Sequence, residues 1–272
     1  MRKRLSTIIL ILVFLVGLSL LLYPTVSDYW NSLHQSRAIA EYAEQVAVLD
    51  NDAYGELWQA ARRYNETLLE KPNRFILTEE EQKEYESLLN VTENGIIGYI
   101  EIPSIDCSLP IYHGTEEAVL QIAVGHIEGS SLPTGGTGTH CVISGHRGLP
   151  SAKLFTDLDK LSNGDTFVLS VLDETLTYEV DQTLIVEPDE LSALEIDPEQ
   201  DYCTLVTCTP YGINTHRLLV RGHRVENQAE SQSIRVTADA IQIEPVVVAP
   251  LVAIPLLLLL LIALLVATRK KK

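Results

Sequence analysis

The chain has 272 residues, of which 20 are basic and 37 acidic, and its formal net charge is −17. Nucleic-acid binding requires a basic surface, so this balance excludes nucleic acid from the expected partners. Apolar residues gather at the two ends of the chain, which is not the composition of a single water-soluble globule.

The N-terminal end carries an uncharged stretch of 18 residues, residues 5–22, directly after Arg2, Lys3 and Arg4. This length meets the requirement for a membrane-spanning helix. A secretory signal peptide also has a basic start and an apolar stretch. The stretch is long for a signal, however, and no clear small-x-small cleavage site follows it. The sequence therefore favours an uncleaved transmembrane anchor over residues 1–22.

Residues 23–92 are predicted to form a helical segment. Residues 32–49 lack Gly and Pro and space their apolar side chains by three and four, which is typical of a helix. The segment 71–75 interrupts this pattern with a proline. Thr78 then stands at the N-cap position of a further helix, with Glu81 at the capping-box position.

Short strands replace helices from Gly95 onward. Segments rich in β-branched residues and bounded by Gly or Pro indicate strands, and short helical patterns lie between them. The predicted strands are 96–102, 109–112, 140–144, 166–172, 176–186, 202–207 and 217–225, and the predicted helices are 116–123 and 151–161. Residues 173–175 are expected to close a hairpin. Residues 93–226 are therefore predicted to be a mostly β domain, a β-barrel with helical insertions.

The C-terminal end repeats the pattern of the N-terminal end. Residues 227–245 read as a linker, residues 246–268 as a second transmembrane helix and residues 269–272 as a basic tail. Basic flanks stay cytoplasmic, so we expect both termini inside the cell. Residues 23–245 then lie outside, with 13 basic against 37 acidic side chains. This charge is that of a solvated surface beside an anionic membrane.

Four cysteines, Cys107, Cys141, Cys203 and Cys208, fall in the outer region. An even number outside the cell is compatible with disulfides, but the spacing is not that of a disulfide-dense domain, and no pair of Cys-x-x-Cys motifs predicts a zinc site. Cys203 and Cys208 are expected on opposite faces of one strand, so no bond should join them. We expect Cys107, Cys141 and Cys203 to be packed side chains and expect no metal.

Cys208 is different, because it ends the β-rich run 204–207 and precedes a turn. A thiol nucleophile needs a base and a group that stabilises the oxyanion. His146 follows a strand between two glycines, and Arg217 begins the strand after Cys208, so both are candidates. His140 is a competing base. On spacing alone, a structural cysteine with an unrelated histidine explains the pattern better.

Two stretches of sequence carry a family resemblance. TLVTCTPYGINTHRLLVRGHR at 204–224 and the long stretch 109–161 resemble the sortases, and specifically the class C, pilus-assembling group. The resemblance covers about residues 96–225 and the layout with two membrane spans. It implies a sortase-like closed barrel of about eight strands, in a membrane protein of a Gram-positive-type cell envelope.

The resemblance also assigns roles to residues. Cys208 matches the nucleophile, His146 the general acid and base, and Arg217 the stabiliser of the oxyanion or of the substrate backbone. Thr207 matches a contributor to the oxyanion site. The implied reaction is transpeptidation: the thiolate cleaves an LPXTG-like sorting signal between Thr and Gly, and an amine takes the acyl group from the thioester. The implied acceptor is a pilin lysine, and no metal or organic cofactor is implied.

A lid is the point at which the chain departs from the family. Members commonly bury the catalytic cysteine under an N-terminal lid that bears an Asp-Pro-aromatic tripeptide, whereas residues 71–75 read KPNRF. In one interpretation Phe75 plugs the cleft and Arg74 lies near the thiol. In the other, an ordinary helix–loop–helix packs Phe75 on the barrel.

Other functions remain compatible with the sequence. A sortase that attaches single proteins to the cell wall would use the amine of the peptidoglycan cross-bridge as its acceptor. A cysteine hydrolase would release the acyl group to water. A membrane-tethered scaffold would bind sorting signals without cleaving them, and it would have no need to keep Cys208, His146 and Arg217 together.

Overall fold

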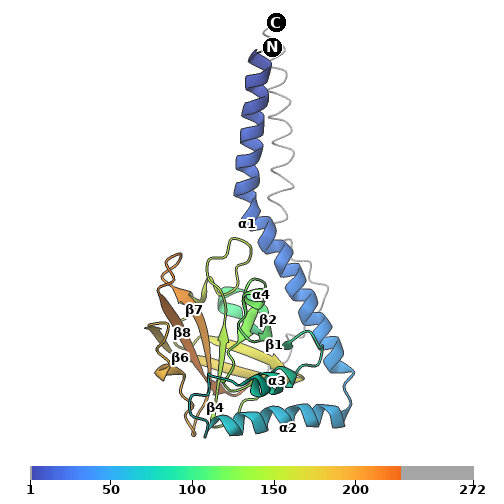
Figure 1. Ribbon diagram of the computed structural model, residues 1–272, viewed down its shortest axis with the longest axis vertical. Coiled ribbons are helices and arrows are strands. Elements are labelled where there is room, and N and C mark those ends of the chain that lie inside the picture. Colours follow the sequence, from blue (N-terminus) through green and yellow to red (C-terminus); the bar gives the residue numbers. More distant parts are fainter. Residues whose placement is uncertain (1, 228–272) are drawn as a thin grey trace. The chain divides into compact units, whose positions relative to one another are not determined.

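The computed structural model describes residues 2–227. The predicted linker beyond residue 227, the second transmembrane helix and the basic tail lie outside the described residues. Within this range the chain forms three N-terminal helices and then a closed barrel of eight strands (Figure 1). Asn31 begins the compact unit that contains the barrel.

Helix α1 (Arg2–Ala47) is continuous through Pro24. Among the described residues it is the one helix that is long and apolar enough to cross a membrane, over the stretch Thr7–Ala47. Past residue 30, one face of the helix packs on the barrel. Tyr42 is 1% exposed, and its hydroxyl donates to the Ile97 carbonyl (3.0 Å) and accepts from the Leu172 amide (2.7 Å).

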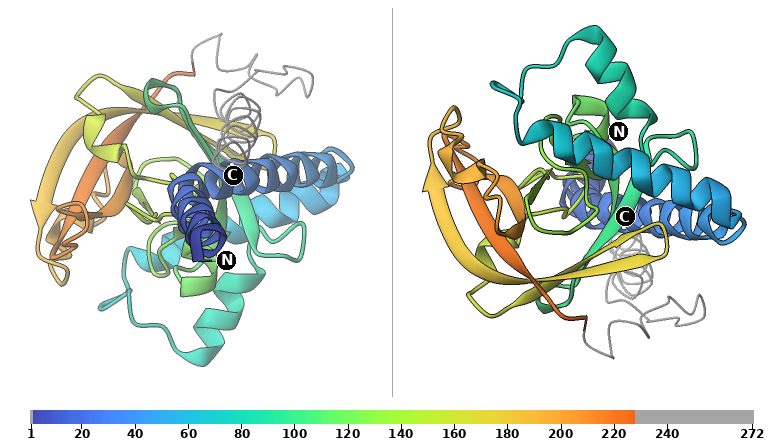
Figure 2. Two further views of the ribbon diagram at one scale, coloured as in Figure 1. Left: turned by 90° about the horizontal axis from the view of Figure 1, so that it is seen from above. Right: turned by 90° about the horizontal axis from the view of Figure 1, so that it is seen from below.

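Helix α2 (Asn51–Leu68) lies across the end of the barrel at which β4 begins (Figure 1; Figure 2, right). Asn65 fastens it there, because its side-chain amide bonds the Leu132 backbone and the Thr134 hydroxyl. Helix α3 (Glu79–Ser87) begins with the predicted capping box of Thr78 and Glu81, which is confirmed. Both helices contribute to the main core, with buried Trp58, Ala61, Tyr64, Leu68 and Tyr85.

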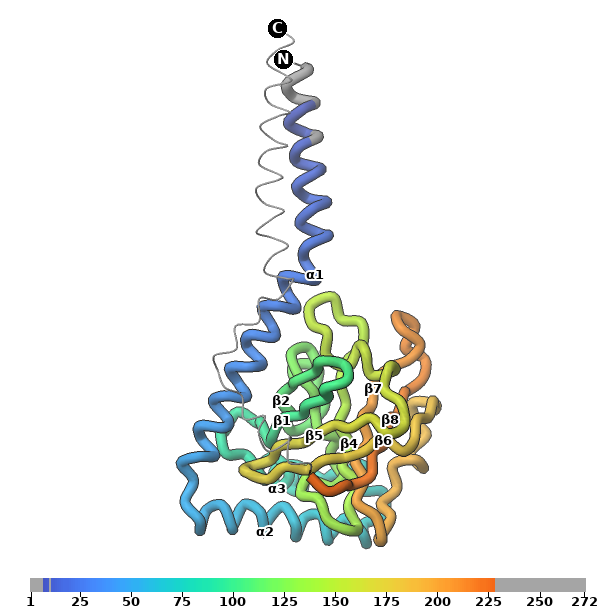
Figure 3. The backbone as a smooth tube through the Cα atoms, turned by 180° about the vertical axis from the view of Figure 1, so that it is seen from behind, coloured from blue at the N-terminus to red at the C-terminus, as the bar shows by residue number. Residues whose placement is uncertain are grey.

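The barrel confirms the predicted mostly β fold with about eight strands. The strands are β1 (Ile96–Ile102), β2 (Cys107–His113), β3 (Val124–His126), β4 (Thr139–Ser144), β5 (Thr166–Val171), β6 (Glu174–Val186), β7 (Asp201–Thr209) and β8 (His216–Val225). Their order is β1-β2-β3-β4-β7-β8-β6-β5, and β5 pairs with β1 to close the sheet. Pairs β2–β3 and β4–β7 are parallel. Figure 3 shows β5 and β6 on the side of the barrel turned away from the viewer of Figure 1.

Two local predictions differ from the structure. Strand β3 was not predicted, because three residues are too few to show a period of two. The predicted helix over 151–161 is wrong, since this segment forms turns and a short 3-10 helix, η2 (Leu158–Lys160). Leu154 adopts a left-handed φ of 40°, and the Phe155 amide bonds the distant His146 carbonyl (3.1 Å). Both features break a helical ladder. Helix α4 (Glu117–Leu120) lies within the predicted 116–123.

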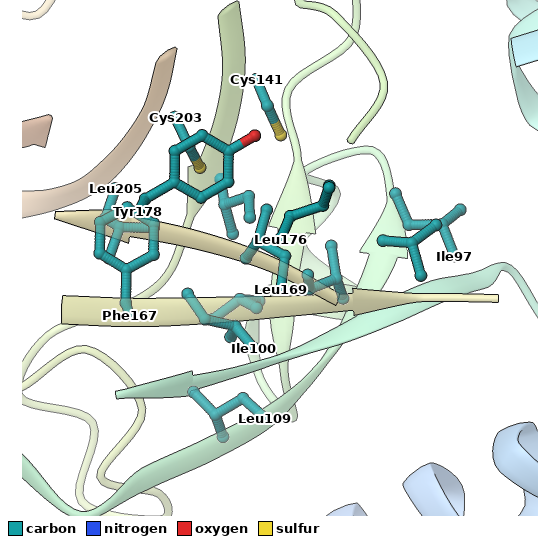
Figure 4. Close-up of a cluster of buried hydrophobic side chains, with 14 of the residues drawn as sticks. Ile97, Ile100, Leu109, Cys141, Phe167, Leu169, Leu176, Tyr178, Cys203 and Leu205 are labelled. Atoms are coloured by element: carbon teal, nitrogen blue, oxygen red, sulfur yellow. The ribbon is translucent and has the colours of Figure 1, made fainter. Parts of the chain in front are cut away.

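Apolar side chains from all sides fill the barrel (Figure 4). Phe167 and Tyr178 stack with ring centroids 5.5 Å apart, and a Cβ at Gly222 would come within 2.7 Å of Phe167, so this position requires glycine. Cys141 and Cys203 point into this core, as predicted for packed side chains. Each large apolar side chain buried in this way contributes about 1.5–3 kcal/mol.

Candidate active site

Cys208 and Arg217 are direct neighbours across the antiparallel pair β7–β8. On its other side β7 pairs in parallel with β4, in a register that sets Ser144 opposite Val206. Extending this register by two residues brings His146 level with Cys208. The structure thus carries the three predicted catalytic residues to the same end of three adjacent strands.

The four cysteines are free thiols in the structure. Cys203 is buried in the barrel, whereas Cys208 is half-buried on the opposite face of β7, so the prediction that no bond joins them is confirmed. Burial raises the pKa of the Cys107 thiol to about 12, and it also raises the pKa of Cys203. The Cys107 and Cys203 thiols are therefore poor nucleophiles at neutral pH. Cys208, unlike these two, is the direct neighbour of Arg217.

His146 stands on an irregular extension of β4 that is held from both sides. The preceding residue, Gly145, donates to the Val206 carbonyl (3.0 Å) and accepts from the Thr207 hydroxyl (2.7 Å). A Cβ at Gly145 would lie 2.7 Å from the Phe155 ring and 2.8 Å from Val124, which is closer than real side chains pack. Glycine at this position therefore lets the chain pass between them and present His146.

Thr207 is 1% exposed, and its side chain lies on the face of β7 opposite Cys208. Because its hydroxyl donates to the Gly145 carbonyl, it links β7 to the segment that carries His146. A contribution of Thr207 to the oxyanion site stays a prediction, and the contact in the structure gives its hydroxyl a positioning role.

Arg217 is half-buried, and its guanidinium donates to the carbonyls of His216 (3.1 Å) and Asn214 (3.4 Å). These carbonyls belong to the end of the β7–β8 loop and the start of β8. The cation is thereby fixed one strand away from the Cys208 thiol. Its planar fork can donate two parallel hydrogen bonds to a substrate oxygen or backbone.

His140, the competing base, lies elsewhere. It is opposite Tyr202, six residues from Cys208, or roughly 20 Å along an extended strand. It is 1% exposed, and its ring bonds the Glu195 carbonyl (2.8 Å) and the Thr204 hydroxyl (2.7 Å). Burial lowers its pKa to about 4. His140 is therefore a neutral structural residue.

Two neighbours of His146 were missed by sequence reasoning. Arg147 pairs with Asp159 (2.5 Å) and lies over the Tyr211 ring at 5.7 Å, so it joins η2 to the loop that follows Cys208. Glu117 of α4 has a carboxylate oxygen 3.9 Å from the His146 imidazole. Arg147 directly follows His146 in the sequence, but the spacing of residues along the chain predicts neither contact.

The outer face of the barrel beside Cys208 and Arg217 is apolar, and other side chains cover it. Val142, Val206, Leu219 and Leu194 form a second buried cluster, and Phe75 packs against it. The pair Val206–Leu219 is the next outward-facing row after Cys208–Arg217, roughly 7 Å away.

Arg74 holds the segment that carries Phe75 against the barrel. It is 6% exposed and donates to the carbonyls of Gly129 (3.1 Å) and Leu194 (2.5 Å), with its guanidinium 4.3 Å from the Phe75 ring. The structure thus places Arg74 on two loops and Phe75 on the apolar row beside the thiol. Both predicted lid residues therefore lie on the face of the barrel that carries Cys208 and Arg217.

Within residues 2–227, no three His, Cys, Asp or Glu side chains are grouped to hold a metal ion. The side chains that the three strands bring together supply a thiol, an imidazole and a guanidinium.

Comparisons with known proteins agree with this geometry. Residues 100–225 match the sortase domain. Sortase C1 of Streptococcus agalactiae is 52% identical in a match that covers 71% of this chain and 100% of that chain, with a TM-score of 0.69. A Streptococcus pneumoniae sortase C, whose structure was described with pilin substrate specificity, is 45% identical over 71% of this chain and 98% of its own, with a TM-score of 0.63. Sortase D of Bacillus subtilis is 34% identical over 131 residues, 47% of this chain and 63% of that protein.

Proposed function

Because this chain belongs to the sortase family of cysteine transpeptidases, we propose that it cleaves LPXTG-like sorting signals between Thr and Gly and transfers the threonyl group to an amine. The observation that carries this proposal is the direct pairing of Cys208 with Arg217, with His146 brought level by the extension of β4.

The three side chains divide the reaction between them. The Cys208 thiolate attacks the threonyl carbonyl carbon, and the Arg217 guanidinium donates to the oxygen on which negative charge develops. His146 gives its proton to the departing glycine amine, which leaves a thioester on Cys208. The neutral imidazole then accepts a proton from the incoming amine as that amine attacks the thioester. The products are a new amide and the regenerated Cys208 thiolate beside a protonated His146.

The acceptor that we propose is a lysine of a pilin subunit. The support is the likeness to proteins named sortase C1 and sortase C, the second of which was described with pilin substrate specificity. The amine of the peptidoglycan cross-bridge remains the second candidate. We further propose that α1 anchors the enzyme in the membrane, with the catalytic domain outside and, together with a second span, both termini inside. The support for this is the apolar character of α1 and the basic ends of the chain.

The test uses the full chain in detergent, incubated with a short LPXTG peptide and then analysed by intact-protein mass spectrometry. We expect a mass gain equal to the N-terminal fragment of the peptide, mapped to Cys208. Adding a lysine peptide or a cross-bridge peptide should convert the adduct to the corresponding amide. Release of free acid alone in the presence of both amines would indicate a hydrolase. Peptide binding without cleavage would indicate a scaffold.

We propose that residues 71–75 act as a lid over the apolar row beside Cys208. Phe75→Ala should then expose this row and raise the rate of thioester formation by about 10-fold, the effect of removing about 1.4 kcal/mol of competing contact. This rate is measured by intact-protein mass spectrometry of samples quenched at a series of reaction times. The matched control is Ile76→Ala, since Ile76 is 75% exposed and should leave the rate unchanged. A lower melting temperature without any gain in rate would instead establish Phe75 as an ordinary packing residue.

A further inference from the structure

The part of α1 that packs on the barrel presents two amides on one face. Asn31 and Gln35 are four residues apart, so their side chains lie one above the other. The same face continues through Ile39 and Tyr42, which are 6% and 1% exposed. Both amides lie within the compact unit that contains the barrel.

Asn31 binds the segment that follows His146. Its side-chain N–H donates to the Ser151 carbonyl at 2.7 Å. Ser151 stands in an irregular stretch whose far end returns to His146, because the Phe155 amide donates to the His146 carbonyl (3.1 Å). The loop that begins at His146 is therefore closed at its base by Phe155 and tied at Ser151 to α1.

Gln35 binds the segment on the other side of His146. Its side-chain N–H donates to the Ile122 carbonyl at 2.7 Å. Two residues later Val124 begins β3, which pairs with the end of β4. Val124 is also the side chain against which Gly145 packs, directly before His146. The two amides of α1 thus hold the two loops between which the catalytic histidine emerges.

We propose that Asn31 and Gln35 are positioning residues that keep His146 in line for proton transfer to the leaving amine. This inference rests on the proposed function of His146. Proton transfer requires hydrogen-bond distance between the imidazole and the reacting nitrogen. The chain around His146 has no regular secondary structure beyond β4, so its placement depends on individual hydrogen bonds. α1 therefore serves as an active-site support as well as an anchor.

The test distinguishes a loss of proton donation by His146 from a general structural defect, because it compares two substrates with different leaving groups. Full-length Asn31→Asp and Gln35→Glu variants keep the side-chain shape but replace the N–H donor with an oxygen that faces a carbonyl. One substrate is the LPXTG peptide amide, whose leaving amine needs a proton. The other is the same peptide with a thioester at the threonyl carbonyl, whose thiolate leaves without one. We expect the double variant to lower kcat for the amide about 10-fold, which is less than the 10²–10⁴-fold that complete loss of general acid–base catalysis would cost. We expect KM for the amide to change less than about twofold. We expect the same of the single-turnover release of thiol from the thioester, which is measured before the deacylation step in which His146 also takes part.

Three controls accompany the double variant. Gln45→Glu makes the same change at an exposed position of the same helix and should leave both rates unchanged. Tyr42→Phe removes the hydroxyl contacts with Ile97 and Leu172 and should lower the melting temperature without changing kcat for the amide. Gln35→Lys restores an N–H donor and should recover most of the amide rate lost in Gln35→Glu.

The outcomes are distinguishable. Equal losses on the amide and the thioester substrate would show a general structural defect and overturn the inference, as would unchanged amide cleavage in the double variant. A wild-type enzyme that forms no acyl-enzyme with either substrate would instead overturn the proposed function.

Discussion

Cys208→Ala is expected to abolish formation of the acyl-enzyme and to lower turnover by at least about 10³-fold, because removal of a catalytic nucleophile costs more than that in comparable hydrolases. The fold should survive. Cys208 is half-buried at the end of β7, outside the barrel core, so shortening its side chain leaves no large cavity. The unfolding free energy should change by less than about 1 kcal/mol.

The measurement compares amide formation by wild-type and variant enzyme from an LPXTG peptide and a lysine peptide, with the melting temperature recorded for each. Cys107→Ala is the matched control, since it removes another free thiol, which packs against the core on β2 and does not neighbour Arg217. It should retain nearly full activity. Residual amide formation by Cys208→Ala at more than a few per cent of the wild-type rate would remove Cys208 from the role of nucleophile.

The features of the fold that depend on neighbouring residues in the sequence were predictable. Strands with clear alternation, such as β1 and β7, lie close to their expected positions. The order of the strands is not local, because the parallel pair β4–β7 joins residues 62 positions apart, such as Ser144 and Val206. No periodicity encodes that pairing, so the closed barrel followed from the family resemblance.

The same distinction applies to the site. The closeness of Cys208 and Arg217 was predictable, because a short loop joins their strands and places them opposite each other. The place of His146 depends on the long-range β4–β7 register, which only the resemblance supplied. The supporting contacts of Thr207 and Asn31 arise from tertiary packing. Ser, Thr and Asn side chains bond backbone groups in many settings, so their types alone indicate no partner.

The packing of α2 and α3 bears on how a lid can be tested. A deletion of residues 23–92 would remove the lid, but it would also remove Tyr42, Trp58 and Tyr85 from the buried interior. Losing large buried side chains of this kind costs about 3–5 kcal/mol each, which is comparable to the whole stability of many domains. Point substitutions at Phe75 therefore test the lid, whereas the deletion tests whether the barrel folds without its helices.

Arg217→Lys is expected to lower kcat about 10²-fold with a smaller change in KM, although the positive charge is kept. Loss of one donor to a developing oxyanion typically costs that much. The guanidinium offers a planar fork fixed by the carbonyls of His216 and Asn214, whereas the lysine ammonium is a flexible point charge that does not reproduce two parallel donors.

Steady-state kinetics on the LPXTG peptide separates kcat from KM. The matched control is Arg221→Lys, because Arg221 also donates through a fork, to Asp181 at 3.0 Å, and lies on the same face of β8 four residues away. That variant loses the same geometry outside the catalytic pair, so it should lower the melting temperature slightly and leave kcat unchanged. A near-normal kcat in Arg217→Lys would show that charge alone suffices beside Cys208. The bidentate role would then be wrong, and Arg217 would act only by attracting or holding the substrate.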